Sequence, residues 1–188
     1  MGGDVRLLVI GDTHIPSRAK KIDDVIVERI MSGGTSQVFC TGDLTDEKLL
    51  DFYAEFGELH VVRGNMDYLN LKKWDVAEIE GLKIGLIHGD GIYPRGNVKE
   101  LCRIAETLAV DVLISGHTHR PQVLMRGLAG GKKVLLLNPG SATGVWGGGG
   151  GSGKPSFMFL DVSRRSCIVH LFELEGRSLK EKTYSFTL

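Results

Sequence analysis

The sequence has little cysteine and no long apolar run, and both absences exclude classes of protein. Its three cysteines, Cys40, Cys102 and Cys167, stand singly without a Cys-x-x-Cys pair, so we expect buried free thiols in a reducing compartment and no closed structural zinc site. No apolar stretch reaches 18 residues, and no charged N-terminal region precedes a long apolar one. We therefore expect neither a membrane span nor a secretory signal, and we predict a cytoplasmic protein.

An excess of charge of either sign is also lacking. The chain has 23 basic and 23 acidic side chains and a sequence pI near 7.0, which leaves no nucleic-acid-binding signature. A length of 188 residues fits one domain, residues 1–188, with room for a core that needs no disulfides. The glycine run Gly147–Gly151, extended by Ser152 and Gly153, is interpreted as a mobile loop within this domain because strand-like sequence resumes directly after it.

Hydrophobic periodicity predicts alternating strands and helices, followed by a β-rich half. The expected strands are Val5–Ile10, Gln37–Cys40, Leu59–Val62, Asp75–Glu80, Lys83–Ile87, Asp111–Ser115, Gln122–Met125, Lys132–Leu137, Ser156–Val162, Cys167–Glu173 and a last strand ending at Phe186. The expected helices are Ile22–Met31, Asp46–Phe56 with Thr45 or Asp46 as its cap, a short polar helix near Asp67–Lys72, and Val98–Leu108. This order predicts an α/β fold with two packed sheets and helices outside.

Seven side chains that can ligate a metal ion stand just past these strand-like runs. They are Asp12, His14, Asp43, Asn65, His88, His117 and His119. Packing does not explain why five separate strand ends carry carboxylate, carboxamide and imidazole groups. One ion would not use seven protein ligands, but two ions that share a bridging carboxylate would, so the pattern predicts a two-metal hydrolytic site.

Two pairs of these side chains are spaced two residues apart. Asp12 pairs with His14, and His117 pairs with His119. In an extended segment this spacing turns both side chains to the same side, so each pair could share a metal ion.

The sequence around these side chains resembles the motif series of the calcineurin-like metallophosphoesterases. The motifs are Gly11-Asp12-Thr13-His14, Gly42-Asp43, Gly64-Asn65, His88-Gly89 and Gly116-His117-Thr118-His119. One motif alone is weak, but all five in order, spread over essentially the whole chain, are specific. The resemblance implies a four-layer αββα sandwich in which two packed mixed β-sheets are flanked by helices.

The resemblance also implies roles for the seven side chains. Asp12, His14 and His119 would hold one ion, and Asn65, His88 and His117 would hold the other. Asp43 would bridge the two, and Asp43, Asn65 and His117 are the candidate catalytic residues. Two divalent ions per chain, with Mn the first choice and Ni, Co, Zn or Fe as alternatives, would activate a bound hydroxide that attacks a small-molecule phosphodiester.

Met66 departs from the pattern of larger relatives, which place a histidine directly after the metal-binding asparagine. A thioether cannot transfer a proton, and general acid–base help is worth about 10²–10⁴ in rate. We therefore expect a modest enzyme that prefers aryl to alkyl leaving groups. Asp67 is interpreted as a supporting or helix-starting carboxylate, whereas Arg63 fits a phosphate contact and a surface ion pair equally well.

Several polar residues near the motifs have weaker claims to a role. The loop Asn138-Pro139-Gly140-Ser141 resembles a site loop of the family, and a plain turn is the alternative. Outside the motifs, Asp90 is expected to be a solvated acid, and His60 and His170 are expected to be structural.

A second interpretation is a scaffold rather than an enzyme. The runs His14-Ile15-Pro16, Ile114–His119 and Asn138–Gly144 resemble the phosphoesterase-fold subunit of retromer, an endosomal sorting complex, in which this fold binds proteins. Such a partner, or a second copy of the chain, could dock on a surface made by Ile92 and Tyr93, or on Trp146. The complete ligand set favours the divalent-metal-dependent phosphodiesterase, and nothing in the sequence identifies the natural substrate.

Overall fold

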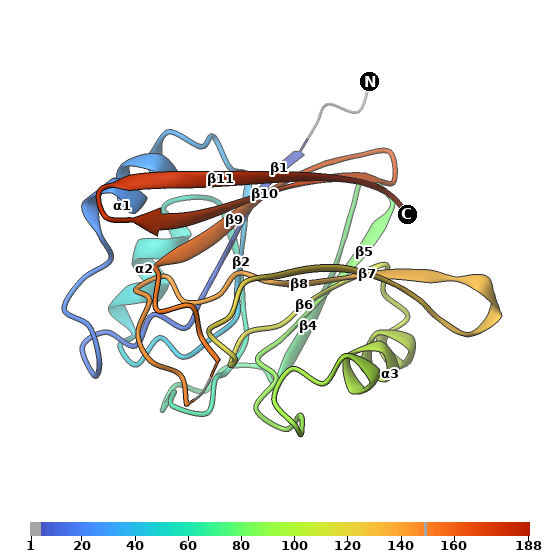
Figure 1. Cartoon of the computed structure of the whole chain (residues 1–188), viewed down its shortest axis with the longest axis horizontal. Helices are drawn as coiled ribbons and strands as arrows, with labels where there is room; N and C mark the ends of the chain where they lie inside the picture. Colours follow the sequence, from blue (N-terminus) through green and yellow to red (C-terminus); the bar gives the residue numbers. More distant parts are fainter. Residues whose placement is uncertain (1–4, 149) are drawn as a thin grey trace.

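The computed structural model describes residues 5–148 and 150–188, which form two β-sheets packed face to face with helices outside (Figure 1). The first sheet has strand order β11-β10-β9-β1-β2-β3. Its strands are β1 (Val5–Ile10), β2 (Gln37–Cys40), β3 (Glu58–Val61), β9 (Ser156–Ser163), β10 (Ser166–Glu175) and β11 (Ser178–Thr187). The expected α/β sandwich of two mixed sheets is confirmed.

The second sheet has strand order β4-β5-β6-β8-β7. Its strands are β4 (Trp74–Ile79), β5 (Leu82–Ile87), β6 (Val112–Ile114), β7 (Gln122–Gly127) and β8 (Lys133–Asn138). The helices are α1 (Asp24–Met31), α2 (Lys48–Ala54) and α3 (Val98–Leu108), and a 3-10 turn spans Ala129–Gly131. In Figure 1, α1 and α2 lie on the side of the first sheet, and α3 lies against the second.

Alternation of buried side chains along the strands produces these layers. On β1, Leu7 and Val9 enter the core between the sheets, while Leu8 and Ile10 pack with α1 and α2. On β8, Leu135 points into the same central core and Leu136 packs against α3. Strands buried on both faces read as continuous apolar runs, which is why the sequence marked them so clearly.

Parallel pairing places the candidate site at one edge of the sandwich. Strands β1, β2 and β3 are parallel in the first sheet, and β5, β6 and β8 are parallel in the second. The carboxyl ends of parallel strands meet at the same edge, so the loops that follow β1, β2, β3, β5 and β6 converge there.

Some expected elements differ from the structure. The described residues contain no helix near Asp67–Lys72, because the Asp67 carboxylate instead accepts hydrogen bonds from backbone amides of the loop after β2. Helix α2 begins at Lys48, and Asp46 accepts the Lys48 N–H without being its cap. Cys40 and Cys167 are buried as expected, whereas Cys102 on α3 is only half-buried.

The glycine-rich segment after β8 has neither helix nor strand at its described positions, and Gly149 within it lies outside the described residues. None of the helices in residues 5–148 and 150–188 has the length and apolar character that a membrane crossing requires.

Candidate metal centre

Most of the candidate ligands sit in left-handed backbone conformations, which side chains other than glycine adopt rarely. These residues are Asp12 (φ 49°), His14 (φ 50°), Asp43 (φ 54°), His117 (φ 65°) and His119 (φ 55°). Strained conformations of this kind persist where the surrounding structure fixes them, and they cluster at functional sites. Extended segments were expected at these positions, and that expectation was wrong.

Glycine precedes several of these residues because neighbouring loops approach the backbone closely. A Cβ atom on Gly116 would stand 2.6 Å from both Asp12 Oδ2 and Thr41 Oγ1, and one on Gly64 would overlap Asp43. The motif glycines therefore let loops from different strands meet around the ligands.

Four of the candidate ligands form a compact buried cluster. One ligand atom from each of Asp12, His14, Asp43 and His119 lies within 4.8 Å of the others. His14 Nε2 is 3.2 Å from His119 Nε2, and His119 Nε2 is 3.3 Å from Asp12 Oδ1. Such a group of imidazole and carboxylate atoms, closed off from solvent, could hold a divalent metal ion.

Asp43 stands between this cluster and the remaining ligands. Its Oδ2 atom is 3.3 Å from His14 Nε2 and 3.5 Å from His88 Nε2, while its Oδ1 accepts the Met66 N–H at 2.8 Å. On the far side, Asn65 Oδ1 is 3.1 Å from His88 Nε2. One carboxylate oxygen is thus within reach of imidazoles from two different loops.

The histidine tautomers suit metal ligation. His88 Nδ1 donates to the Thr41 carbonyl at 2.8 Å, and His119 Nδ1 donates to the Val145 carbonyl at 2.7 Å. In a neutral imidazole whose Nδ1 carries the proton, Nε2 presents a lone pair, and here both Nε2 atoms face the cluster. The donor set contains only nitrogen and oxygen, so it fits a first-row divalent cation.

His117 belongs to the half of the site that contains His88. Its ring lies edge-on to the His88 ring with centroids 5.1 Å apart, and its backbone N–H donates to Asp12 Oδ2 at 3.0 Å. His119 instead joins Asp12 and His14. Asp12 and His14 therefore share one part of the site, as their i, i+2 spacing predicted, whereas His117 and His119 lie in different parts of it.

Burial and neighbouring charges shift the protonation of the cluster. Burial, followed by the positive charge of Arg18, lowers the pKa of His14 to about 4. Burial also lowers the pKa of His117 to about 4, with His88 the next cause. Both imidazoles are therefore neutral, the form that binds metal, across the physiological pH range.

Asp12 and His119 stabilise each other's charged forms. Burial alone would raise the pKa of Asp12, but the hydrogen bond from His119 and the surrounding histidine charges bring it below its ordinary value. Burial alone would lower the pKa of His119, and its hydrogen bond to Asp12 raises it instead. Burial raises the pKa of Asp43.

Asp67 fastens the loops that carry Asp43 and Asn65. Its buried carboxylate accepts the N–H groups of Asp43 (2.8 Å), Leu44 (2.7 Å), Thr45 (3.0 Å) and Gly64 (2.8 Å). It is a supporting carboxylate, as one of the sequence interpretations held, and it does not begin a helix.

The loop after β8 supports the loops of the ligands from behind. Ser141 Oγ donates to the Asp12 carbonyl at 2.7 Å, and Asn138 Nδ2 donates to the Gly116 carbonyl at 2.8 Å. The Ser141 hydroxyl thus bonds to the backbone of Asp12 rather than to its carboxylate. No function was predicted for Asn138 itself, although its loop, Asn138-Pro139-Gly140-Ser141, resembles a site loop of the family.

The remaining candidates lie away from the cluster or on the surface. Arg63 and Asp90 are exposed. His60 stacks on Phe39 and bonds to Asp75, and His170 bonds to Asp161 and Glu181, so both are structural as expected.

The expected Ile92–Tyr93 surface is only half present. Ile92 is 5% exposed and packs in the core beside α3, because the loop after His88 folds it inward, so the expectation that it forms a docking surface was wrong. Tyr93 is 76% exposed and Trp146 is 75% exposed.

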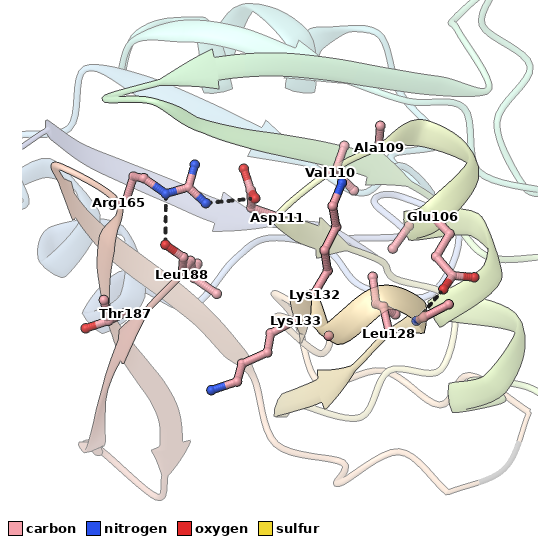
Figure 2. A pocket seen from close by; sticks show the side chains of 13 residues that line it. Glu106, Ala109, Val110, Asp111, Leu128, Lys132, Lys133, Arg165, Thr187 and Leu188 are labelled. Atoms are coloured by element: carbon pink, nitrogen blue, oxygen red, sulfur yellow. Dashed lines mark hydrogen bonds and ion pairs between the residues drawn. The ribbon is translucent and has the colours of Figure 1, made fainter.

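A cavity of about 710 Å³ lies at the ends of β6 and β8 that are opposite the metal cluster. Figure 2 shows its lining, in which Arg165 donates to Asp111 (3.2 Å) and to the Leu188 carbonyl (2.9 Å). Asp111 precedes β6, whereas His117 and His119 follow it, so this cavity and the metal cluster occupy opposite edges of the sheet.

The chain is similar to known proteins over most of its length. Residues 5–165 match the calcineurin-like phosphoesterase superfamily domain. A probable metallophosphoesterase of Methanocaldococcus jannaschii is 40% identical over 143 residues, which cover 76% of this chain and 71% of that protein.

Two solved relatives share the fold at full length. A single mutant of Vps29 from Entamoeba histolytica is 35% identical to this chain with a TM-score of 0.89, and the match covers 97% of this chain and 100% of that one. The wild-type protein, which was solved in complex with Zn²⁺, is 33% identical with a TM-score of 0.85, and the match covers 96% of this chain and 99% of that one. Vps29 of Chaetomium thermophilum, solved with a cyclic peptide, is 28% identical with a TM-score of 0.81 and 98% and 97% coverage. With its motif series, its two-sheet fold and its buried ligand cluster, the chain belongs to the calcineurin-like phosphoesterase superfamily.

Proposed function

We propose that the protein is a divalent-metal-dependent phosphodiesterase that uses two metal ions. The observation that carries the proposal is the position of Asp43 Oδ2, 3.3 Å from His14 Nε2 and 3.5 Å from His88 Nε2. A scaffold needs no carboxylate between two sets of imidazoles, whereas a two-metal hydrolase needs a bridging ligand.

The chain divides its ligands between two positions. Asp12, His14 and His119 would hold one ion, Asn65, His88 and His117 would hold the other, and Asp43 would be the ligand shared between them. When bound, the ions supply a water of lowered pKa and positive charge that offsets the charge of the phosphodiester. The carbonyls of Thr41 and Val145 orient two of the imidazoles through their Nδ1 atoms.

The leaving group receives no proton from the residues beside Asn65. Met66 has a thioether that cannot donate, and both oxygens of Asp67 are engaged by backbone N–H groups. Good leaving groups such as nitrophenolates therefore react fastest, and alkyl diesters react slowly.

Several first-row ions fit a nitrogen and oxygen ligand set, and Mn²⁺ is our first choice. The zinc complex of Vps29 from E. histolytica supports divalent-metal binding at this fold and makes Zn²⁺ the first alternative.

The test is hydrolysis of bis-p-nitrophenyl phosphate by protein stripped of metal and then given Mn²⁺, Ni²⁺, Co²⁺ or Zn²⁺ singly. Turnover is expected to return with metal and to be lost in Asp43→Asn and His117→Ala. Asp90→Asn, which neutralises an exposed acid next but one to His88, is the matched control and keeps its turnover. A folded, metal-loaded protein without turnover would contradict the proposal.

A protein-binding scaffold is the second candidate. Tyr93 and Trp146 are large, exposed side chains on loops beside the metal centre, and C. thermophilum Vps29 was solved with a cyclic peptide. Surfaces of this kind mark docking sites when they are contiguous. Stoichiometric metal binding without hydrolysis of any diester would favour this candidate over the enzyme.

A further inference from the structure

A second cavity, of about 450 Å³, lies beside the loop that carries His117 and His119. Its lining includes Arg95, Thr118, Arg120, Pro121 and Val123. Thr118 stands between the candidate ligands His117 and His119, and Arg120 follows His119 directly, so the cavity opens beside the loop that carries both imidazoles.

The lining of this cavity is positively charged. It holds two guanidinium groups and no carboxylate, and neither arginine forms an ion pair within residues 5–148 and 150–188. Thr118 Oγ1 accepts the Asn138 amide and the Arg120 N–H, at 3.1 and 3.2 Å. The two guanidinium groups are therefore the charged donors of the cavity, beside the neutral side-chain amide of Gln122.

Arg95 is held close to the metal cluster. Its Nη1 donates to the Gly147 carbonyl, and Gly147 packs flat against the ring of His119, where a Cβ atom would overlap it. One of five guanidinium N–H groups is used in this way. The Arg120 side chain makes no hydrogen bond with the described part of the chain, so its whole fork is free.

In the larger cavity, shown in Figure 2, the cations share the lining with carboxylates. Its cations include Lys132, Lys133 and Arg165, but Asp111 and Glu106 share the lining, and Arg165 is paired with Asp111. In the second cavity, two cations without acidic partners among the described residues occur together beside the loop of His117 and His119, where a second anionic group of a substrate could bind.

We propose that Arg95 and Arg120 form a second phosphate subsite. This proposal rests on the proposed function, and it implies that the preferred substrates are phosphodiesters that carry a further phosphate group. Guanidinium groups bind phosphate oxygens through paired, charge-assisted hydrogen bonds. The scissile phosphate would lie at the metal centre and the second phosphate in the arginine cavity. A nucleotide that carries a terminal phosphate in addition to its diester has this chemistry.

The test compares two substrates that differ by one phosphate: thymidine 5′-(p-nitrophenyl phosphate) and the same ester with a 3′-phosphate. In the wild-type protein the 3′-phosphate is expected to raise kcat/KM about tenfold or more, because charge-assisted hydrogen bonds from the guanidinium groups stabilise the added phosphate. In Arg95→Gln/Arg120→Gln the ratio of the two values falls toward one. Arg126→Gln, an exposed arginine of β7 that does not line the cavity, keeps the wild-type ratio.

A binding measurement separates this subsite from the proposed function. Metal-free protein in EDTA is titrated calorimetrically with inorganic pyrophosphate, and binding is expected in the wild type and in Asp43→Asn but weakened at least about tenfold in the double arginine variant. Binding without turnover of any diester overturns the phosphodiesterase and keeps the subsite. Turnover with equal kcat/KM for both thymidine esters, or pyrophosphate binding unchanged in the double variant, overturns the subsite.

Discussion

Replacing Asp67 by asparagine is expected to destabilise the protein and to weaken its metal binding. The carboxylate is 2% exposed and accepts four backbone N–H groups, two on each oxygen. In Asp67→Asn one of these oxygens becomes an NH₂ group that faces two N–H donors. Hydrogen bonds to charged groups contribute about 1.5–3 kcal/mol each, and partial relaxation of the loops keeps the expected loss near 3 kcal/mol.

The metal affinity is expected to fall because the released amides belong to the two loops that carry the ligands Asp43 and Asn65. Asp67 Oδ2 binds the N–H groups of both Asp43 and Gly64, so it ties the loop of the bridging carboxylate to the loop of Asn65. Loss of a residue that orients metal ligands typically costs 10–100-fold in affinity, and we expect roughly that range here.

Urea denaturation of the metal-free proteins gives the stability change, and calorimetric titration with Mn²⁺ gives the affinity. Asp46→Asn is the matched control, because Asp46 is a partly exposed acid of the same loop that accepts one backbone N–H, from Lys48 at 3.0 Å. It is expected to stay within about 1 kcal/mol of the wild type. An Asp67→Asn protein that matched this control in stability and affinity would refute the assigned role.

Three further predictions concern the residues around the cluster. Gly147→Ala would push the glycine-rich loop off the ring of His119 and is expected to weaken Mn²⁺ binding by calorimetry, whereas Gly91→Ala, whose Cβ meets open space, is not. The free energy of unfolding of the metal-free protein is expected to fall as the pH drops from 6.5 toward 4, because the unfolded chain takes up a proton that His14, with a pKa of about 4, does not. Urea denaturation at pH 7 and pH 5 should give a smaller difference in the free energy of unfolding for His14→Gln than for the wild type. Met66→His is expected to raise the rate on alkyl relative to aryl diesters by about tenfold or more in steady-state assays, and an unchanged ratio would argue against a missing proton donor.

Much of the fold could be predicted because parallel strands that are buried on both faces appear in the sequence as continuous apolar runs. The bounds of β1, β2 and α3 agree with those expected from periodicity. The helix expected near Asp67–Lys72 failed for a physical reason: Asp67 bonds to amides of a distant loop, and local propensity carries no information about such a tertiary contact.

The candidate ligands could also be identified in advance, since polar groups that follow buried strands have few structural explanations. Their geometry could not, because the left-handed conformations of Asp12 and His117 depend on contacts between loops. The loop of Asn138 could be identified by resemblance, but its hydrogen bond to the Gly116 carbonyl could not, because it joins two loops that are 22 residues apart in the chain.

The most direct test of the account is the rate of bis-p-nitrophenyl phosphate hydrolysis measured against the number of Mn²⁺ ions bound per chain. We predict little turnover up to one ion and a rise between one and two ions, with the rise absent in Asp43→Asn because its bridging oxygen is lost. Full activity at one ion would contradict the two-metal site. No activity at two ions would contradict the phosphodiesterase.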